Sequence, residues 1–363
     1  MEEKGLQHKV DFPHTVSHEL FMRRAMELAL NGTGNVSPNP LVGCVIAHEG
    51  KIIGEGWHQK YGGNHAEVNA IEDVYNKELL RESTLYVNLE PCSHTGKTPP
   101  CADMILGQGI REVVIANKDI NPLVAGAGIR KLRDAGISVI TGILKSEGLD
   151  LNKRFFTYIE KKRPHIILKW AETSDGFIAR KNNDSKWISD DYSRQLVHKW
   201  RAEEDAVLVA SGTAWYDNPS LNVRDWTGRN PVRIVIDRYL KLGPNQHVFD
   251  RKQKTICYNL QKEDSDENLR YIRLENKNFL ESMVQSLHQQ KIQSVIVEGG
   301  GQLLNSFIKA NLWDEARIFV SPERFEQGVP APYIRGATRE QRKLDKDWLK
   351  ILVPAFQDIS LKV

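Results

Sequence analysis

Residues 62–71 read G-G-N-H-A-E-V-N-A-I, and residues 88–103 read N-L-E-P-C-S-H-T-G-K-T-P-P-C-A-D. In the first stretch His65 is expected to open a helix that Asn64 caps. The second stretch ends an expected strand and carries two cysteines, each preceded by proline. Prolines suit a helix start, where the helix dipole favours a thiolate at Cys101. Histidine and cysteine at strand and helix ends indicate one site in an α/β domain.

Four side chains in these stretches predict a catalytic zinc centre. His65, Cys92 and Cys101 offer one imidazole and two thiolates, which leave the fourth tetrahedral position open for water. Glu67 can reach the same site because side chains in a first turn lean toward the helix N-terminus. It would take a proton from that water and pass it to a leaving group. H-x-E with a later P-C is the zinc deaminase pattern, although eight residues rather than two separate these cysteines.

Three other interpretations of these residues stay open at this point. The cysteines could be unrelated buried residues beside a surface histidine. A structural zinc site would need a fourth protein ligand, for which His94 is the nearby candidate. A disulfide between Cys92 and Cys101 is disfavoured in a reducing compartment.

Composition indicates a two-domain globular protein of the cytoplasm. The chain has 363 residues, of which 40% are hydrophobic and 27% charged. Its 50 basic and 47 acidic residues give a net charge of +3, which does not indicate a nucleic-acid-coating surface. We expect no membrane span and no secretory signal at the N-terminus. Four cysteines do not form a disulfide scaffold, and Cys44 and Cys257 are expected in the core.

Expected strands and helices alternate along the chain, which predicts two α/β units. We place the first domain at 17–145, a helical linker at 146–163 and the second domain at 164–363. The first helix is expected from a Ser17 cap to about Leu30. Its expected apolar face contains Leu20, Phe21, Leu28 and Ala29.

The intercysteine segment E-P-C-S-H-T-G-K-T-P-P-C resembles the bifunctional riboflavin-biosynthesis deaminase/reductase family. S-P-N-P-L-V-G-C-V-I at 37–46 and D-I-N-P-L-V-A-G-A-G at 119–128 resemble that family's pyrimidine-binding loops. In the second half, the resemblance lies in S-D-G at 174–176, D-S-K-W-I-S at 184–189, D-N-P-S-L-N-V-R at 217–224 and V-E-G-G-G-Q-L-L at 297–304. The resemblance implies a cytidine-deaminase-like α/β/α domain followed by a dihydrofolate-reductase-like α/β domain.

The resemblance also implies a substrate, cofactors and two reactions. Zinc-dependent hydrolysis would remove the 2-amino group of 2,5-diamino-6-(5-phosphoribosylamino)pyrimidin-4(3H)-one. NADPH would then reduce the ribosyl group to ribityl, giving 5-amino-6-(5-phosphoribitylamino)uracil. The partner is therefore a small molecule, and neither nucleic acid nor membrane is expected. We also expect a homo-oligomer.

Residues for both reactions follow from the resemblance. In the deaminase domain, those expected to bind substrate are Asn39, His94, Thr95 and Lys97. In the reductase domain, those expected to contact NADPH are Ala171, Trp187, Thr213, Asp217, Gly300, Gly301, Gln302, Leu303, Leu304, Asn305 and Ser306. Those expected to contact the reductase substrate are Lys169, Ser185, Arg201, Leu221, Arg224 and Glu298. Arginine suits a ribose phosphate because its planar fork matches phosphate oxygens.

The glycine run at 299–301 points to a phosphate near a helix N-terminus. It is not a complete G-x-G-x-x-G and does not follow a first strand, so a Rossmann domain is disfavoured. The chain departs from the family pattern after Pro322, where E-R-F-E-Q-G-V-P-A-P-Y stands in place of the family's glycine-bearing loop. The alternative function is therefore a zinc deaminase with an inactive or altered reductase domain.

Overall fold

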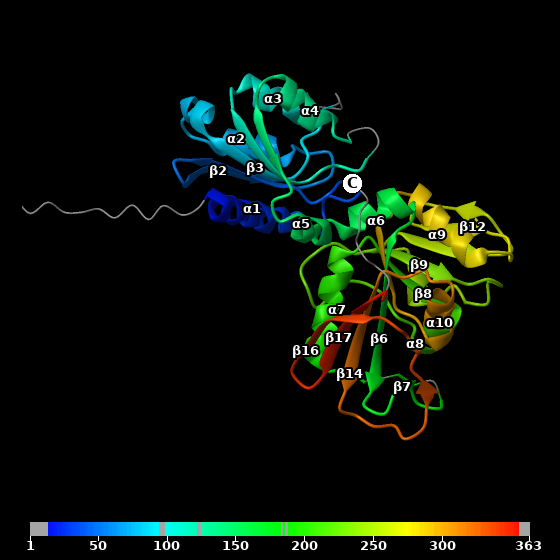
Figure 1. The fold of residues 1–363 in the computed structure, drawn as a ribbon. Helices are drawn as coiled ribbons and strands as arrows, with labels where there is room; N and C mark the ends of the chain where they lie inside the picture. The colour runs from blue at the N-terminus through cyan, green and yellow to red at the C-terminus, as the bar shows by residue number, and fades with distance from the viewer. Residues whose placement is uncertain (1–13, 94–98, 122–124, 183, 186–187, 356–363) are drawn as a thin grey trace, which may run out of the picture. The chain divides into compact units, whose positions relative to one another are not determined.

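The computed structural model describes residues 14–93, 99–121, 125–182, 184–185 and 188–355 (Figure 1). The chain divides into two compact units, Met1–Ile159 and Glu160–Val363. Within the described ranges, the model contains no helix with the length and apolar character needed to cross a membrane.

The first unit is built on a five-stranded sheet in the order β2-β1-β3-β4-β5. Strand β1 pairs antiparallel with both β2 and β3, whereas β3, β4 and β5 run parallel. The strands are β1 (Gly43–His48), β2 (Lys51–Trp57), β3 (Thr84–Leu89), β4 (Glu112–Asn117) and β5 (Ser138–Thr141). The parallel strands bury both faces, and this explains their near-continuous apolar sequences.

Helices cover both faces of this sheet. They are α1 (His14–Leu30), α2 (Ala66–Asp73), α3 (Cys101–Gly107), α4 (Ala127–Asp134), α5 (Lys145–Leu151) and α6 (Lys153–Lys161), with a 3-10 helix η1 (Lys77–Glu82). Cys44 and Ile46 of β1 face the core under α2, α3 and α4, whereas Val45 and Ala47 face α1. This alternation follows from the two-residue period of a strand and gives an α/β/α sandwich (Figure 1).

Three local predictions in this unit are wrong. Helix α1 begins at His14, so Ser17 lies inside the helix rather than at its cap. Leu20 is 65% exposed, whereas the other three residues predicted for the apolar face of α1, Phe21, Leu28 and Ala29, are buried. Asn64 does not cap α2, because the N-cap residue of that helix is His65. The Asn64 carbonyl instead accepts a hydrogen bond from the His58 ring.

The segment expected as a linker forms most of α5 and all of α6, and its residues up to Ile159 belong to the first unit. Phe155 and Phe156 are buried in one cluster with Leu89 of β3. Asn152 accepts from the Leu41 amide at 2.8 Å and donates to its carbonyl at 2.9 Å. These contacts tie the helical segment to the loop that precedes β1.

The second unit contains a ten-stranded sheet in the order β11-β12-β10-β9-β8-β13-β6-β14-β17-β16. Strands from β12 to β14 run parallel, and the outer pairs are antiparallel. The central strands are β6 (His165–Thr173), β8 (Ala206–Ala210), β9 (Val232–Ile236), β10 (Thr255–Asn259), β12 (Leu269–Arg273), β13 (Ser294–Val297) and β14 (Glu315–Ser321). The others are β7 (Phe177–Ala179), β11 (Asp264–Ser265), β15 (Val329–Pro330), β16 (Ala337–Lys343) and β17 (Trp348–Val353). Strands β7 and β15 form a separate antiparallel pair.

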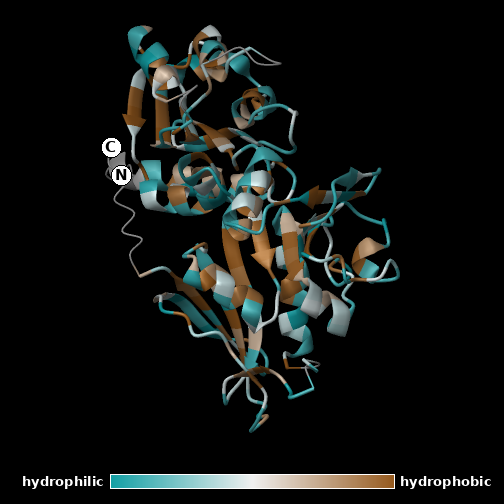
Figure 2. Cartoon of the chain, turned by 90° about the vertical axis from the view of Figure 1, so that its right-hand side faces the viewer, coloured by the Kyte–Doolittle hydropathy of each residue, from teal (hydrophilic) through white to brown (hydrophobic). Residues whose placement is uncertain are grey.

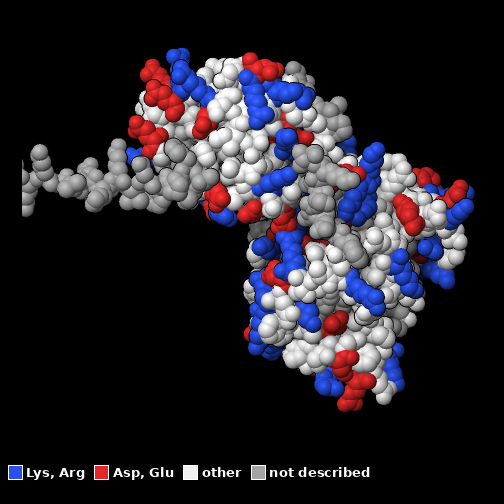
Figure 3. Space-filling model, viewed as in Figure 1, with Lys and Arg blue, Asp and Glu red and all other residues white. Residues whose placement is uncertain are grey.

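Two helical layers cover the faces of this larger sheet. The helices are α7 (Asp191–Glu203), α8 (Ser211–Asp217), α9 (Phe279–Gln289) and α10 (Gly301–Lys309), with a 3-10 helix η2 (His247–Phe249). Ile166 and Leu168 of β6 pack toward α9 and α10, whereas Ile167 packs toward α7. The strands of both units are mainly hydrophobic (Figure 2). On the face shown in Figure 3, Lys and Arg are interspersed with Asp and Glu.

The start of the second unit is fixed by a buried carboxylate. Asp314 accepts from the guanidinium of Arg163 and the ammonium of Lys161, and its Oδ2 accepts from the Ile166 amide at 2.9 Å. Burial alone would raise the pKa of Asp314, but these cations hold it well below its usual range. Cys44 and Cys257 are fully buried and free, as predicted for core residues.

Two candidate active sites

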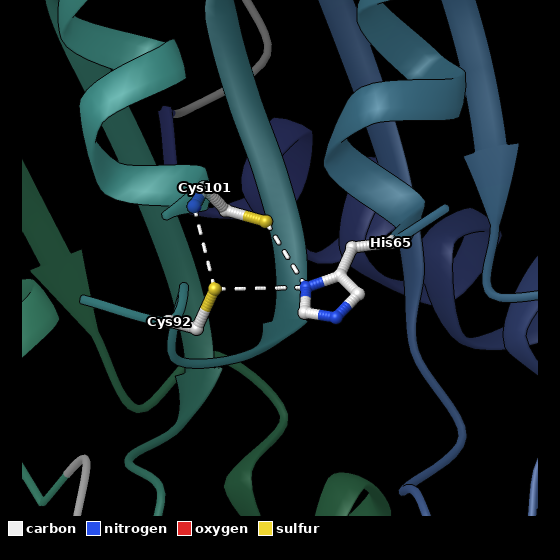
Figure 4. A group of neighbouring side chains, drawn as sticks. All are labelled: His65, Cys92 and Cys101. Atoms are coloured by element: carbon white, nitrogen blue, oxygen red, sulfur yellow. Dashed lines mark hydrogen bonds between the residues drawn. The ribbon is translucent and has the colours of Figure 1, made fainter. Parts of the chain in front are cut away.

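The predicted metal ligands converge in the first unit (Figure 4). The His65 Nδ1 lies 3.2 Å from the Cys101 sulfur and 3.6 Å from the Cys92 sulfur. The Cys101 amide also donates to the Cys92 sulfur at 3.3 Å. One atom from each of the three side chains lies within 4.8 Å of the other two, so a single ion can reach all three. An imidazole and two thiols in this arrangement fit zinc, with a fourth tetrahedral position left open.

Secondary structure explains this convergence. His65 stands at the N-cap of α2, Cys101 is the first residue of α3, and Cys92 follows β3. Helix α2 lies directly on β2, where a Cβ at Gly56 would come within 2.3 Å of the Ala70 amide nitrogen. Glycine is therefore required there for the helix that carries His65 and Glu67 to approach the sheet.

The electrostatics of this centre suit metal binding and proton transfer. The hydrogen bond from Cys101 lowers the pKa of Cys92 to about 4, against the effect of burial and with a contribution from His65. The same contact raises the pKa of Cys101. Glu67 is 3% exposed and hydrogen-bonds to the Cys101 thiol, and burial raises the pKa of its carboxyl. The carboxyl group that the zinc chemistry requires is thus within reach of the ligand set.

Sequence reasoning missed His58, which links the predicted ring-binding residue to the metal ligands. The His58 ring contacts the Asn39 side-chain nitrogen at 3.0 Å through Nε2 and the Asn64 carbonyl at 2.8 Å through Nδ1. Its ring also meets that of His65 edge-on, with centroids 5.7 Å apart. The sequence signal that could have identified His58 as a site residue is its position directly after the strand that ends at Trp57.

Two buried polar side chains hold the loops around this centre. Asn88 accepts from the Gly43 amide at 2.8 Å and fixes the segment that carries Asn39. Glu90 accepts hydrogen bonds from the amides of Asp119, Gly126 and Ile129, and so joins three points of the chain after β4 to the end of β3. Both were missed because their partners lie 29 to 45 positions away in sequence. The predicted substrate residues His94, Thr95 and Lys97 lie outside the described residues.

A cavity of about 720 Å³ in the second unit contains most of the predicted reductase residues. It lies at the carboxyl ends of β6, β8 and β13, the edge where open α/β sheets bind ligands. The predicted residues that line it are Lys169, Ala171, Ser185, Arg201, Thr213, Asp217, Leu221, Arg224, Glu298, Gly300, Gly301, Gln302 and Leu303.

A buried ion cluster forms one wall of this cavity. Arg201 forms a bidentate pair with Glu298, with both nitrogen–oxygen distances at 2.7 Å, and also donates to the Asn222 carbonyl. Burial raises the pKa of Glu298, but Arg201 and Lys169 outweigh it and lower the pKa to about 2. Burial lowers the pKa of Lys169, an effect that Glu298 partly offsets. The guanidinium of Arg201 is thus engaged by Glu298 instead of being held ready for a phosphate.

The glycine run that follows Glu298 forms another part of the cavity lining. Gly300 is the N-cap residue of α10, and its amide donates to the Thr213 hydroxyl at 3.0 Å. Ser185 donates to either carboxylate oxygen of Asp217 at 3.4 Å. The motifs at 184–189, 217–224 and 297–304 therefore meet in one pocket.

The predicted cofactor contacts at the end of the glycine motif are not supported by the cavity lining. Leu304 is fully buried in the hydrophobic core, and the Ser306 hydroxyl bonds to the Gln302 carbonyl of its own helix. Asn305 does not line the cavity either. Trp187 lies outside the described residues.

The segment after Pro322, where the sequence departs from the family pattern, builds part of the pocket rim. Strand β15 pairs with β7, and Val329 lines the cavity. A Cβ at Gly328 would lie 2.2 Å from the Ala179 carbonyl oxygen, so glycine permits this close pairing. The lip of the pocket is thus present in this chain.

Helix α7 contributes further pocket residues that sequence reasoning missed. Arg194 and His198 line the cavity together with Arg201; His198 and Arg201 follow Arg194 at the i+4 and i+7 positions, on one face of the helix. Burial, together with Arg201 and Arg224, lowers the pKa of His198 to about 4. The helical spacing of these basic residues was the available signal.

Comparison with family models matches each unit separately. Residues 15–117 match the cytidine and deoxycytidylate deaminase zinc-binding region. Residues 164–325 match the RibD C-terminal domain. The two matched regions contain the metal-ligand cluster and the cavity, respectively.

Relatives and solved structures match the chain over nearly its whole length. Riboflavin biosynthesis protein RibD of Aquifex aeolicus is 40% identical over 85% of this chain and 88% of that protein. The RibD protein of Escherichia coli is 37% identical over 84% of this chain and 88% of that protein. The crystal structure of a diaminohydroxyphosphoribosylaminopyrimidine deaminase/5-amino-6-(5-phosphoribosylamino)uracil reductase from Thermotoga maritima is 39% identical, covers 94% of this chain and 100% of that chain, and superposes with a TM-score of 0.88. The structure of Acinetobacter baumannii RibD is 32% identical, covers 94% of this chain and 99% of that chain, and has a TM-score of 0.85. The chain therefore belongs to the RibD family of bifunctional riboflavin-biosynthesis enzymes, which combine a zinc-dependent deaminase with an NADPH-dependent reductase.

Proposed function

We infer that this protein deaminates 2,5-diamino-6-(5-phosphoribosylamino)pyrimidin-4(3H)-one in its first unit and reduces the product in its second. Deamination consumes one water and releases one ammonia, leaving 5-amino-6-(5-phosphoribosylamino)uracil. Reduction consumes one NADPH and one proton and opens the ribosyl ring to a ribityl chain. The observation that carries the proposal is the cluster of His65, Cys92 and Cys101 beside the buried carboxyl of Glu67.

In the deaminase site, His65, Cys92 and Cys101 would hold the zinc ion, and Glu67 would move protons. When bound, zinc supplies a Lewis acid that lowers the pKa of a coordinated water to about 7. Glu67 accepts the proton that the attacking water loses and delivers it to the departing amino group at the 2-position of the ring. Its burial and its hydrogen bond to Cys101 keep its carboxyl at the ligand set.

Asn39 is proposed to bind the edge of the pyrimidine ring, because its amide offers both a donor and an acceptor. His58 supports this role by contacting the Asn39 amide nitrogen and the backbone just before His65. Through Asn39 and His58, the position of the bound pyrimidine ring is thus coupled to the position of the metal ligand His65. His94, Thr95 and Lys97 remain proposed substrate contacts from the sequence resemblance.

In the reductase site, NADPH would supply the hydride that adds to the ribosyl carbon 1. Gly300, Gly301 and Thr213 form the glycine-rich wall, where backbone amides at the start of α10 suit a cofactor phosphate. Asp217 and Ser185 form the neighbouring polar contact. Trp187, Asn305 and Ser306 remain proposed contacts from the sequence resemblance.

Arg224 and Lys169 are proposed to act on the sugar. Arg224 is exposed at the mouth of the cavity, and its guanidinium suits the ribose phosphate. Lys169 is half-buried and lines the cavity, and its lowered pKa suits a group that gives a proton to the sugar oxygen as the ring opens. Arg201 and Glu298 would position Lys169 through their ion pair and charges.

The experiment supplies the diaminopyrimidine substrate to the full-length protein without NADPH. One ammonia should be released per substrate, and NADPH added afterwards should be oxidised in equal amount. A matched sample treated with a zinc chelator should release no ammonia but should still oxidise NADPH with the deaminated substrate. Oxidation of NADPH by the diamino substrate before any ammonia release would contradict the proposed order.

We also propose a cytoplasmic homo-oligomer. Light scattering on the purified protein measures the oligomeric state directly, and a mass equal to one chain would exclude an oligomer at the concentration used.

A further inference from the structure

A carboxylate contacts two of the basic side chains that line the reductase cavity. The Oδ2 atom of Asp225 lies 3.1 Å from His198 Nε2 and 3.5 Å from Arg224 Nε. His198 and Arg224 both line the cavity, whereas Asp225 is not among the lining residues. One acidic oxygen is therefore shared by two basic side chains that face the proposed substrate.

The His198 ring and the backbone of Arg224 are held by contacts that do not involve that carboxylate. The Nδ1 atom of His198 lies 3.0 Å from the Asn222 carbonyl and 3.4 Å from the Arg224 amide, so the ring presents Nε2 to Asp225. The Asn222 carbonyl also accepts from Arg201 at 3.2 Å. These backbone contacts fix the segment on α7, and the Asp225 side chain can leave without releasing it.

The contact itself suits displacement. The side chains of Asp225 and Arg224 are 53% and 54% exposed, whereas that of His198 is 3% exposed. Exposed ion pairs are weak and pay an entropic cost for holding two flexible side chains. A phosphate monoester carries about −1.5 to −2 charge at neutral pH and offers three acceptor oxygens, so it competes well against one carboxylate.

We propose that the Asp225 carboxylate stands in for the substrate phosphate in the ligand-free reductase site and is displaced when the phosphorylated sugar binds. The inference rests on the proposed anchoring of that phosphate by Arg224. Asp225 compensates the charge of Arg224 and contacts the His198 ring while the site is empty. Return of the Asp225 carboxylate favours release of the phosphorylated product. Asp225 therefore sets the affinity of the site for its phosphorylated ligands and takes no part in hydride transfer.

The test uses Asp225→Asn, which keeps the shape of the side chain and removes its charge. The KM for the deaminated substrate and the inhibition constant of inorganic phosphate should both fall roughly two- to fivefold, as expected for loss of a weak competing ion pair. Asp264→Asn is the matched control, because Asp264 is exposed, pairs with Lys262 at 3.1 Å and lies outside the cavity lining. It should leave both constants at the parental values.

A double-mutant cycle with Arg224→Ala separates displacement from a long-range charge effect. If Asp225 competes for Arg224, then Asp225→Asn should lower KM much less in the Arg224→Ala background. An undiminished gain in that background would overturn the inference, as would an unchanged or raised KM for Asp225→Asn alone. An Arg224→Ala protein with unchanged KM would instead overturn the proposed phosphate anchor and the inference with it. Thermal melting of each variant checks that the fold is retained.

Discussion

The two sites of this molecule are assembled in different ways. The metal cluster draws its ligands from residues 65, 92 and 101. All three lie at the ends of helices or strands in the first unit. The reductase cavity draws its lining from residues between 169 and 329, on several strands, the three helices α7, α8 and α10, and the β7–β15 pair. The first site depends on three exact ligand atoms, whereas the second spreads its contacts over a large surface. Single substitutions should therefore abolish the first activity but only weaken the second.

The largest effect is expected from removing a metal ligand. Cys92→Ser should reduce bound zinc from one per chain to a small fraction and should abolish deamination, because a hydroxyl is a poor substitute for a thiolate ligand. Elemental analysis of the purified protein measures the zinc content. Cys257→Ser is the matched control, because that cysteine is buried in the other unit. Full zinc occupancy in Cys92→Ser would place the ligands elsewhere.

The next effect is expected from removing the proton carrier while keeping the metal. Glu67→Gln retains the shape of the side chain, so zinc content should stay at the parental level. Deamination should fall about 10²–10⁴-fold, the usual contribution of a general acid–base group. Ammonia release under saturating substrate measures the change. Parental ammonia release by this variant would remove Glu67 from the mechanism.

A smaller effect is expected from a single substitution in the reductase cavity, whose contacts are spread over many residues. Arg224→Ala should raise the KM for the deaminated substrate by roughly tenfold to a hundredfold, because a lost charge-assisted hydrogen bond costs about 1.5–3 kcal/mol. NADPH absorbance at varied substrate concentration measures it. Arg251→Ala, which removes an exposed arginine outside the cavity lining, should leave KM unchanged.

The smallest effect is expected in the pH dependence of reduction. Burial lowers the pKa of Lys169, so its proton is lost at a pH below the ordinary lysine value of 10.5. If protonated Lys169 assists ring opening, kcat should be constant at lower pH and should fall as pH rises through that lowered pKa. Lys169→Met should lose this alkaline decline, whereas Lys241→Met, an exposed lysine, should keep it. An identical alkaline decline in Lys169→Met would assign the titration to another group.

The difference between the sites also explains what the sequence could predict. The fold class of both units is confirmed, because apolar strands alternating with helices are a local signal. The metal cluster was predicted completely, because its ligand types and spacing lie in two short motifs. His58 and Glu90 were missed because their roles depend on partners that only the folded sheet brings close. Leu304 packs in the hydrophobic core, and its cofactor contact stays a prediction, because a motif match does not show which way a helix turns its side chains.

The same limit applies to the rim of the reductase cavity. The segment after Pro322 resembles no family loop in sequence, yet its β15 strand pairs with β7 and brings Val329 to the cavity. Backbone pairing places this strand, so its side chains carry little signal. The alternative of an altered reductase domain had its only basis in this segment.

The central claim is that each unit holds one complete and separable site. Measuring ammonia release and NADPH oxidation separately on both Glu67→Gln and Arg224→Ala tests it most directly. The account predicts that Glu67→Gln oxidises NADPH with the deaminated substrate at the parental rate while releasing almost no ammonia from the diamino substrate. It predicts that Arg224→Ala releases ammonia at the parental rate while its reduction is impaired. Loss of both activities in either folded variant would contradict it.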